Sequence, residues 1–209
     1  MDAESTKRYT ELPFVLQALH TRELTLVSPK SWDDKNDAYA IEQYRRKRGL
    51  GSVLALCLTD AEQTHHHWKV FTHGSSGACI HFHPDQFGTW LAAQAEIQGR
   101  PVIYRSVAQL RSTLPPIEDL PFIKRAAYEP EREFRLLHGH ASRTKRTHAL
   151  PFNLSMIRRI VLSPWMPVPT FEASRAIIHG INGCSSMPVN RATIVESADW
   201  QKLIKRAAA

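Results

Sequence analysis

Cysteine is scarce in this sequence, and long hydrophobic runs are missing from it. The 209 residues include three cysteines, Cys57, Cys79 and Cys184, which are widely spaced and form no C-x-x-C pair. Such a set provides no disulfide framework and is typical of a reducing compartment. No stretch approaches the roughly 20 apolar residues of a membrane span, and the N-terminus MDAESTKRY lacks the apolar core of a signal peptide. We therefore expect a cytoplasmic protein that does not bind membranes.

The common nucleotide and metal signatures are also missing. The sequence contains no Walker motif, no dinucleotide-binding fingerprint and no H-E-x-x-H. Histidine is plentiful, with adjacent residues at 65–67 and H-x-H pairs at 81–83 and 138–140. Zinc needs three or four ligands that converge on one point, which consecutive histidines cannot supply. We therefore expect no metal site.

Positive charge is what the sequence has in excess. Lysine and arginine number 27 against 20 acidic residues, which gives a formal net charge of +7. An excess of this sign favours anionic partners such as nucleotides or nucleic acid. Much of it lies in two clusters, at 45–48 and 143–146. Such clusters form either solvated faces or phosphate-binding sites, and both interpretations stay open here.

Hydrophobic periodicity predicts short helices that alternate with short strands. Apolar residues recur at helical spacing between Leu12 and Leu19, and the apolar run at 52–58 is typical of a buried strand. The predicted helices span residues 12–21, 39–48, 60–72 (capped by Thr59), one that begins at Pro84, and 170–181. The predicted strands span residues 23–29, 52–58, 77–82, 101–105, 158–164 and 191–196. This mixture predicts one α+β domain over residues 1–209, built on a mixed or mostly antiparallel sheet.

The segment YEPEREFRLLH (128–138) concentrates opposed charges just before an apolar stretch. Read as a strand from Glu131 onward, it places Glu131, Glu133 and Arg135 on one face and Phe134 and Leu136 on the other. Two carboxylates and a guanidinium in a row suit a catalytic acid/base pair or a ligand clamp. A solvated sheet face with ordinary ion pairs is the alternative.

Several segments resemble, in order and spacing, the bacterial domain-of-unknown-function 2971 family. The family signature s-P-x-x-f-N-D-P-f-D is similar to SPKSWDDKND (28–37). Its W-x-x-Y-a-x-x-x-x-G-v-C-I-x-F block is similar to WKVFTHGSSGACIHF (68–82). Its K and E-x-E-w-R block resembles Lys124 and YEPEREFR (128–135), and its late strand resembles IRRIVLSP (157–164).

The match has departures as well as retained positions. Asp33 stands where the family has Asn, Lys35 where it has Pro, and Tyr128 where it has Trp. The retained residues are Pro29, Asp34, Asp37, Trp68, Gly77, Glu131, Glu133 and Arg135.

The resemblance implies a bacterial or phage setting. The family is similar to abortive-infection proteins of the AbiGi type, which implies a defence or toxin-like role and an antitoxin or phage protein as partner. The layout is also similar to that of ADP-ribosyltransferases of the DarT and RNA 2′-phosphotransferase kind, which use NAD as substrate. In that layout Arg8 and Tyr9 occupy the first strand, and Glu131 or Glu133 lies on the last.

Three functional hypotheses follow. The first is an enzyme that cleaves the glycosidic bond of NAD or a nucleotide. Its catalytic residues are Glu133 and Glu131, and its substrate-binding residues are Arg135, Arg8, Tyr9, Trp68, Asp34, Asp37 and Lys124. Glu133 stabilises the oxocarbenium charge, a basic residue holds phosphate, and Trp68 or Tyr9 stacks on a base.

The second hypothesis is a nuclease in which Asp34, Asp37, Glu131 and Glu133 hold a divalent metal. The third is a module that binds a nucleotide or a phage component without chemistry. In the third, the two glutamates only pair with Arg135 and Lys124 to hold the sheet together.

Overall fold

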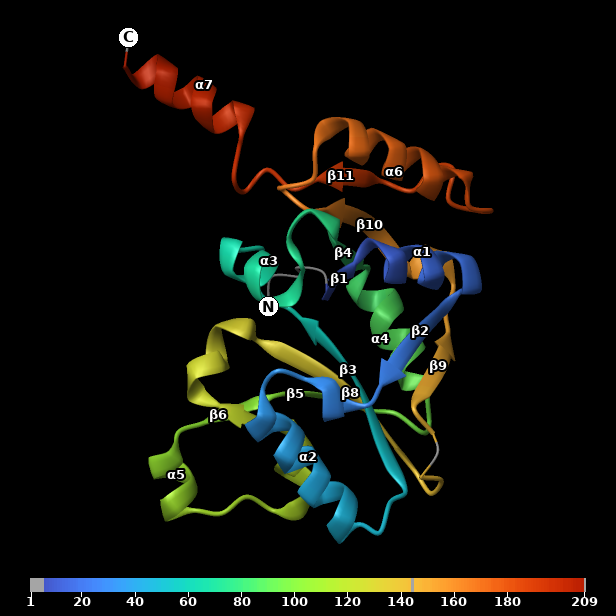
Figure 1. Ribbon diagram of the computed structural model, residues 1–209, viewed down its shortest axis with the longest axis vertical. Coiled ribbons are helices and arrows are strands. Elements are labelled where there is room, and N and C mark those ends of the chain that lie inside the picture. The colour runs from blue at the N-terminus through green and yellow to red at the C-terminus, as the bar shows by residue number, and fades with distance from the viewer. Residues whose placement is uncertain (1–5, 144, 209) are drawn as a thin grey trace.

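Helices and strands alternate along the computed structural model, which describes residues 6–143 and 145–208 (Figure 1). The strands are β1 (Lys7–Glu11), β2 (Glu23–Val27), β3 (Ser52–Thr59), β4 (Gly77–Phe82), β5 (Gln98–Pro101), β6 (Ile103–Arg105), β7 (Ile123–Arg125), β8 (Glu133–His140), β9 (Thr147–Pro151), β10 (Ile157–Leu162) and β11 (Val189–Arg191). The α-helices are α1 (Leu12–Thr21), α2 (Lys35–Lys47), α3 (His65–Phe71), α4 (Pro84–Ala92), α5 (Val107–Ser112), α6 (Val168–Gly180) and α7 (Ala198–Ala207). Short 3₁₀ helices connect them: η1 (Pro29–Ser31), η2 (Gly74–Ser76), η3 (Ile117–Phe122), η4 (Ala126–Glu131) and η5 (Leu154–Met156).

One large sheet organises these elements. Its strands follow the order β11-β10-β4-β1-β3-β2-β9, and β8 and β5 extend it from the other edge of β3. Apart from β10 and β11, which run parallel, its neighbouring strands are antiparallel. A separate parallel pair is formed by β6 and β7. The predicted α+β class with a mostly antiparallel sheet is therefore confirmed.

The sheet divides beside β3. One edge of β3 pairs with β8 along its whole length. On the other edge, within the part of the chain that the structure describes, β1 pairs at Lys7 and Thr59 alone, and β2 pairs at Val27 and Ala55 alone. No strand in the described ranges pairs with residues 56–58 on that edge, and α1 connects the two diverging strands β1 and β2.

Both faces of β3 are buried, as its continuous apolar run predicts. Leu54, Leu56 and Leu58 face a large core that α1, α4 and α6 complete. Val53 and Ala55 face a second core, to which α2 and η3 contribute. A third, smaller cluster forms where α3 packs on β4 and β10.

Several predicted boundaries prove wrong. Glu131 is not part of the strand: it ends η4, and Arg132 then takes a left-handed conformation with φ 43° before β8 begins at Glu133. Thr59 does not cap α3 but is the last residue of β3, and Thr64 caps the helix instead, five residues further on. Asp34 caps α2 by accepting from two backbone N–H groups, so that helix begins earlier than predicted.

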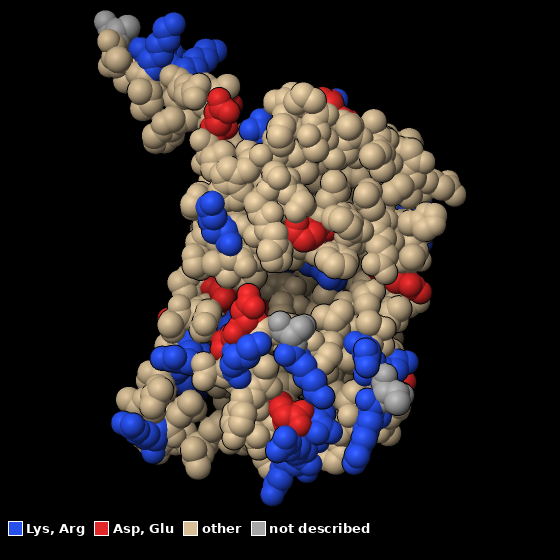
Figure 2. All heavy atoms as spheres, in the orientation of Figure 1, with Lys and Arg blue, Asp and Glu red and all other residues tan. Residues whose placement is uncertain are grey.

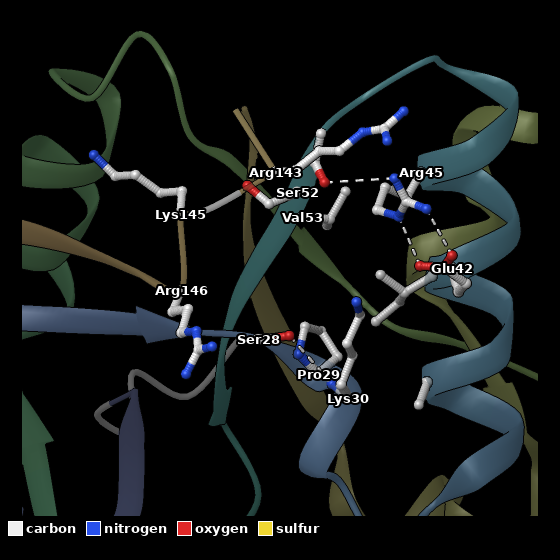
Figure 3. A pocket seen from close by; sticks show the side chains of 13 residues that line it. Ser28, Pro29, Lys30, Glu42, Arg45, Ser52, Val53, Arg143, Lys145 and Arg146 are labelled. Carbon is white, nitrogen blue, oxygen red and sulfur yellow. Dashed lines mark hydrogen bonds and ion pairs between the residues drawn. The ribbon is translucent and has the colours of Figure 1, made fainter. Parts of the chain in front are cut away.

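Two surface features bear on function. The face of the molecule seen in Figure 2 is hollowed across its middle, with acidic side chains on one rim of the hollow and lysines and arginines gathered below it. The basic area lies where Figure 1 places α2 and where the connection from β8 to β9 passes the start of β3 (Figure 3). No helix in the described ranges is both long enough and apolar enough to span a bilayer.

Candidate functional site

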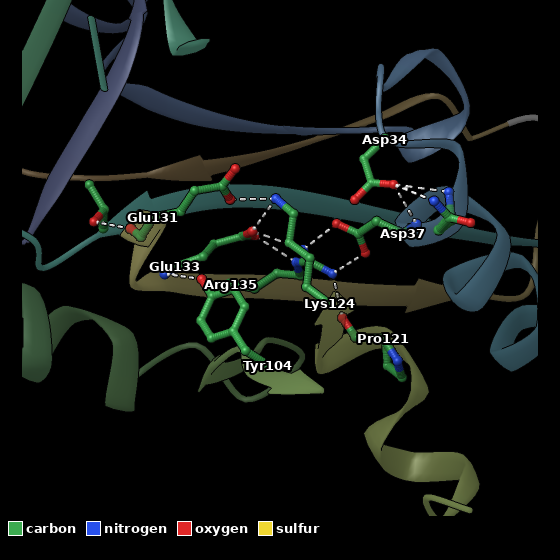
Figure 4. Close-up of polar contacts among 10 residues, drawn as sticks. Asp34, Asp37, Tyr104, Pro121, Lys124, Glu131, Glu133 and Arg135 are labelled. Carbon is green, nitrogen blue, oxygen red and sulfur yellow. Dashed lines mark hydrogen bonds and ion pairs between the residues drawn. The ribbon is translucent and has the colours of Figure 1, made fainter. Parts of the chain in front are cut away.

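Arg135 lies at the centre of a buried group of charged side chains (Figure 4). Its guanidinium binds Glu133 through Nε–Oε1 at 2.7 Å and Nη2–Oε2 at 3.0 Å. It also binds Asp37 through Nη1–Oδ1 at 2.8 Å and Nη2–Oδ2 at 2.6 Å, and Nη1 donates to the Pro121 carbonyl at 2.7 Å. These contacts use all five N–H donors of the guanidinium.

Lys124 joins this group to Glu131. Its Nζ lies 2.5 Å from Glu131 Oε2 and 3.3 Å from Glu133 Oε2. Thr59 Oγ1 donates to the Glu131 backbone carbonyl at 2.6 Å, which fixes the end of η4 against β3. We call Asp37, Lys124, Glu131, Glu133 and Arg135 the charge cluster.

The charge cluster is not a solvated face. Relative exposure is 2% for Asp37, 9% for Lys124, 2% for Glu131, 5% for Glu133 and 0% for Arg135. The alternative of ordinary surface ion pairs on this face is therefore wrong. Buried charges need partners, and each of these five side chains has at least one oppositely charged partner within the cluster.

The two glutamates have pKa values shifted in opposite directions. Burial alone would raise the pKa of Glu133, but Arg135 and Lys124 outweigh it and lower that pKa to about 2. For Glu131 burial prevails over the attraction of Lys124, so its pKa is raised above the ordinary 4.5. Environments that separate two carboxyl groups in this way are typical of acid/base pairs in active sites.

Both glutamates line a small cavity at the division of the sheet. The cavity measures about 80 Å³ and is lined by Lys7, Tyr9, Cys57, Leu58, Thr59, Phe71, Glu131 and Glu133. Tyr9 stacks on His67 with ring centroids 5.6 Å apart and on Phe71 at 6.1 Å. We call Tyr9, His67 and Phe71 the aromatic shelf.

A second, larger hollow shares Glu133 with this cavity. It measures about 360 Å³, and Tyr104 and Arg132 also line it. The Tyr104 hydroxyl accepts from the Glu133 backbone N–H at 2.8 Å. Small-molecule sites usually measure about 300–1,000 Å³. The small cavity alone would hold only part of a ligand, and the adjoining hollow would hold the rest.

The other residues proposed from the sequence are placed differently. Trp68 is 0% exposed in the third core, so its faces cannot stack on a ligand. Arg8 lines a separate hollow of about 300 Å³, and burial lowers its pKa to about 10, so it remains charged at neutral pH. Asp34 accepts from Asn36 N at 3.0 Å and caps α2. Asp37 belongs to the charge cluster, where Arg135 occupies both of its oxygens.

Lys7, Thr59, Phe71 and Tyr104 were not selected from the sequence. Lys7 lies two residues before Tyr9 on β1, and residues two apart on a strand share a face. This spacing could have identified Lys7 from the sequence. Phe71 and Tyr104 reach the site through pairing between distant segments, for which the sequence carries no local signal.

Metal ligands converge elsewhere. Glu96, His138 and His148 form the group in the described ranges whose potential ligand atoms lie within 4.8 Å of one another. The rings of His138 and His148 stack at 4.0 Å. The acids of the charge cluster form no such group within those ranges, because Lys124 and Arg135 lie between them. The geometry therefore does not favour the nuclease hypothesis, and the expectation of no metal site stays a prediction.

Comparison with known proteins gives a limited picture. No protein-family model matches the sequence, and no curated protein matches it. Two solved structures resemble the fold: Thermus sp. 2.9 DarT in complex with NAD⁺, and the same protein in complex with ADP-ribosylated ssDNA. Both have a TM-score of 0.48, with 9% and 12% identity, and the matches cover 94% of this chain and 99% and 98% of those chains. A likeness of this size assigns neither a family nor an activity.

Proposed function

We propose that this protein cleaves the glycosidic bond of NAD or a related nucleotide and transfers the ribosyl group. The observation that carries the proposal is the pairing of Glu131 and Glu133 in one cavity, with their pKa values separated by their surroundings. Cleavage of glycosidic bonds needs this division of labour between a permanently ionised carboxylate and one that exchanges a proton.

Glu133 supplies the fixed negative charge. With a pKa of about 2 it is ionised throughout the physiological range. The charge cluster holds three carboxylates against two cations, so one negative charge is uncompensated within it when all three acids are ionised. A ribosyl group that becomes positively charged as its bond breaks would be stabilised there.

Glu131 is the residue suited to proton exchange. Its raised pKa brings protonation nearer to neutral pH, where a general base is most effective. Lys124 holds its carboxylate by one oxygen, Oε2, so Oε1 is the atom that would accept the proton of the attacking water or acceptor.

The aromatic shelf would hold the base that leaves. Tyr9 and Phe71 both line the cavity that contains the two carboxylates. Stacking of a planar base on an aromatic face contributes about 1–3 kcal/mol. The stacking role predicted for Tyr9 is therefore kept, and Phe71 takes the place of the buried Trp68.

The acceptor and the biological setting are further parts of the proposal. The net charge of +7 favours nucleic acid as the acceptor. The resemblance to the domain-of-unknown-function 2971 family and to abortive-infection proteins supports a toxin-like role in defence, with an antitoxin or phage protein as partner.

Release of the base from NAD tests the activity. The purified protein is incubated with NAD, alone and with single-stranded oligonucleotides, and released nicotinamide is measured. Glu131→Gln and Glu133→Gln each keep the side-chain shape, and we expect at least a 100-fold lower rate. Glu196→Gln is the matched control, because Glu196 is an exposed glutamate outside the site. Equal rates in all folded variants, or no turnover of NAD under any condition, would reject the enzyme.

A non-catalytic binding module is the second candidate. The observation that favours it is that every N–H of Arg135 is donated within the protein, as a purely structural network requires. In that case NAD or a nucleotide binds with a measurable Kd and is recovered unchanged. Glu131→Gln and Glu133→Gln would then lower the melting temperature, and neither the wild type nor the variants would form a product.

A further inference from the structure

A second cavity, larger than the one that the glutamates line, lies at the opposite end of β3 (Figure 3). It measures about 400 Å³ and lies between η1, α2, the start of β3 and the connection from β8 to β9. Ser52 opens β3 and Thr59 ends it, so at about 3.3 Å per residue the two sites are about 23 Å apart. We call it the basic pocket.

Four cations around the basic pocket are uncompensated. Lys30, Arg143, Lys145 and Arg146 line it and are exposed. Within residues 6–143 and 145–208, no carboxylate forms an ion pair with any of the four. The remaining cation, Arg45, is already bound to Glu42 and to the Leu50 carbonyl.

Ser52 adds an unsatisfied donor to the same wall. Ser52 is 9% exposed, and its Oγ has no hydrogen-bond partner among the residues that the structure describes. A buried hydroxyl without a partner is unfavourable for the folded protein. A phosphate oxygen in the basic pocket would satisfy it.

Gly51 keeps the cationic connection close to this wall. A Cβ at Gly51 would lie 1.9 Å from the Ala141 carbonyl oxygen, so only glycine allows the two backbones to approach this closely. The Gly51 N–H also donates to the His140 carbonyl at 2.9 Å. The segment that carries Arg143, Lys145 and Arg146 is therefore held beside Ser52.

We infer that the basic pocket binds the phosphate backbone of a nucleic-acid strand. A strand is favoured over a lone phosphate because the four uncompensated cations carry more positive charge than one phosphate neutralises, and exposed Lys47 adds to that charge at the end of α2. Binding to such a surface is driven by the release of counterions from the phosphates. The site deepens the proposed function by giving a nucleic-acid acceptor a place on the protein, but binding itself needs no residue of the charge cluster.

Fluorescence anisotropy with a labelled single-stranded 20-mer tests the site between 50 and 200 mM salt. The triple variant Lys30→Gln, Arg143→Gln, Lys145→Gln removes three charges from the pocket. We expect at least about tenfold weaker binding and a salt slope shallower by about 2, at roughly 0.7 per phosphate contact. The control triple variant Arg111→Gln, Arg125→Gln, Lys202→Gln removes the same charge from exposed positions elsewhere and should change affinity less than about threefold.

A neutral substitution separates a built site from general charge. Ser52→Ala should weaken binding by about tenfold while leaving the melting temperature unchanged or higher, because an unsatisfied hydroxyl is removed. Equal losses in the two triple variants, or full affinity in Ser52→Ala, would overturn the assignment. An adenosine monophosphate that competes as well as the 20-mer would overturn the nucleic-acid ligand in favour of a free nucleotide.

The Glu131→Gln variant keeps the two proposals apart. It should bind the 20-mer with wild-type affinity whether or not NAD is turned over. Loss of binding in this variant would contradict the separate site. Wild-type protein that binds the 20-mer but releases no nicotinamide from NAD would reject the enzyme and leave the basic pocket standing.

Discussion

Arg135 holds Glu133 from two residues further along the same strand, with Nε–Oε1 at 2.7 Å and Nη2–Oε2 at 3.0 Å. The same guanidinium binds Asp37 from α2, so β8 and α2 are tied together by one buried cation. This relationship both lowers the pKa of Glu133 and aligns its carboxylate along the cavity. It also leaves no donor of Arg135 for a ligand, so we do not propose the substrate-binding role expected for Arg135.

Removal of Lys124 should strongly destabilise the fold. Lys124→Met leaves Glu131 without its ion-pair partner and Glu133 with one fewer, in a buried place. Loss of one partner of a buried pair lowers the free energy of unfolding by about 3–5 kcal/mol. Urea denaturation measures this value. Arg48→Met breaks a half-exposed pair with Glu118 and should change it by no more than about 1 kcal/mol. A similarly small change for Lys124→Met would show that the ion pairs of the charge cluster are solvated and contribute little to stability.

The stability of the protein should fall in acid partly through Glu133. Its folded-state pKa of about 2 lies below the ordinary 4.5, so its contribution is complete above pH 4.5 and is lost as the pH falls toward 2. The difference corresponds to an order of 3 kcal/mol. Denaturation curves between pH 3 and pH 6 should show a flatter dependence in Glu133→Gln than in the wild type. Identical slopes would contradict the lowered pKa. Glu131 has the opposite effect. Because its pKa is raised in the folded state, it lowers the free energy of unfolding as the pH rises above 4.5.

Local patterns predicted the elements whose ends carry strong signals. The predicted helix at 12–21 and strand at 77–82 coincide with α1 and β4. Pro13 in the first turn of α1 and the apolar spacing define the helix, and Gly77 and Pro84 bracket the strand. The end of η4 could not be predicted in this way, because a left-handed Arg132 is rare for a residue other than glycine.

The candidate site could be predicted in its composition but not in its geometry. All five members of the charge cluster were chosen from the sequence, and the structure brings them into contact. The sequence could not show that Trp68 faces the core or that Arg8 lines a different hollow. The direction of Arg8 depends on the register of β1 against β4 and β3, because a shift of one residue would exchange the two faces of β1. The direction of Trp68 depends on how α3 packs on β4 and β10.

The aromatic shelf should control affinity for the base. Tyr9→Leu keeps an apolar side chain but removes the stacking surface, and we expect about a tenfold higher KM for NAD. Tyr9→Phe keeps the ring, and with it the stacking surface, so it should behave like the wild type. Steady-state kinetics measures both. An unchanged KM in Tyr9→Leu would place the base elsewhere.

A carboxyl-detected NMR titration of glutamate side chains between pH 4 and pH 8 tests the central claim most directly. The account predicts that the Glu131 signal moves within this range, with a midpoint above 4.5, while the Glu133 signal stays at its ionised position throughout. Two glutamates that titrate with the same midpoint would contradict the separation of their roles.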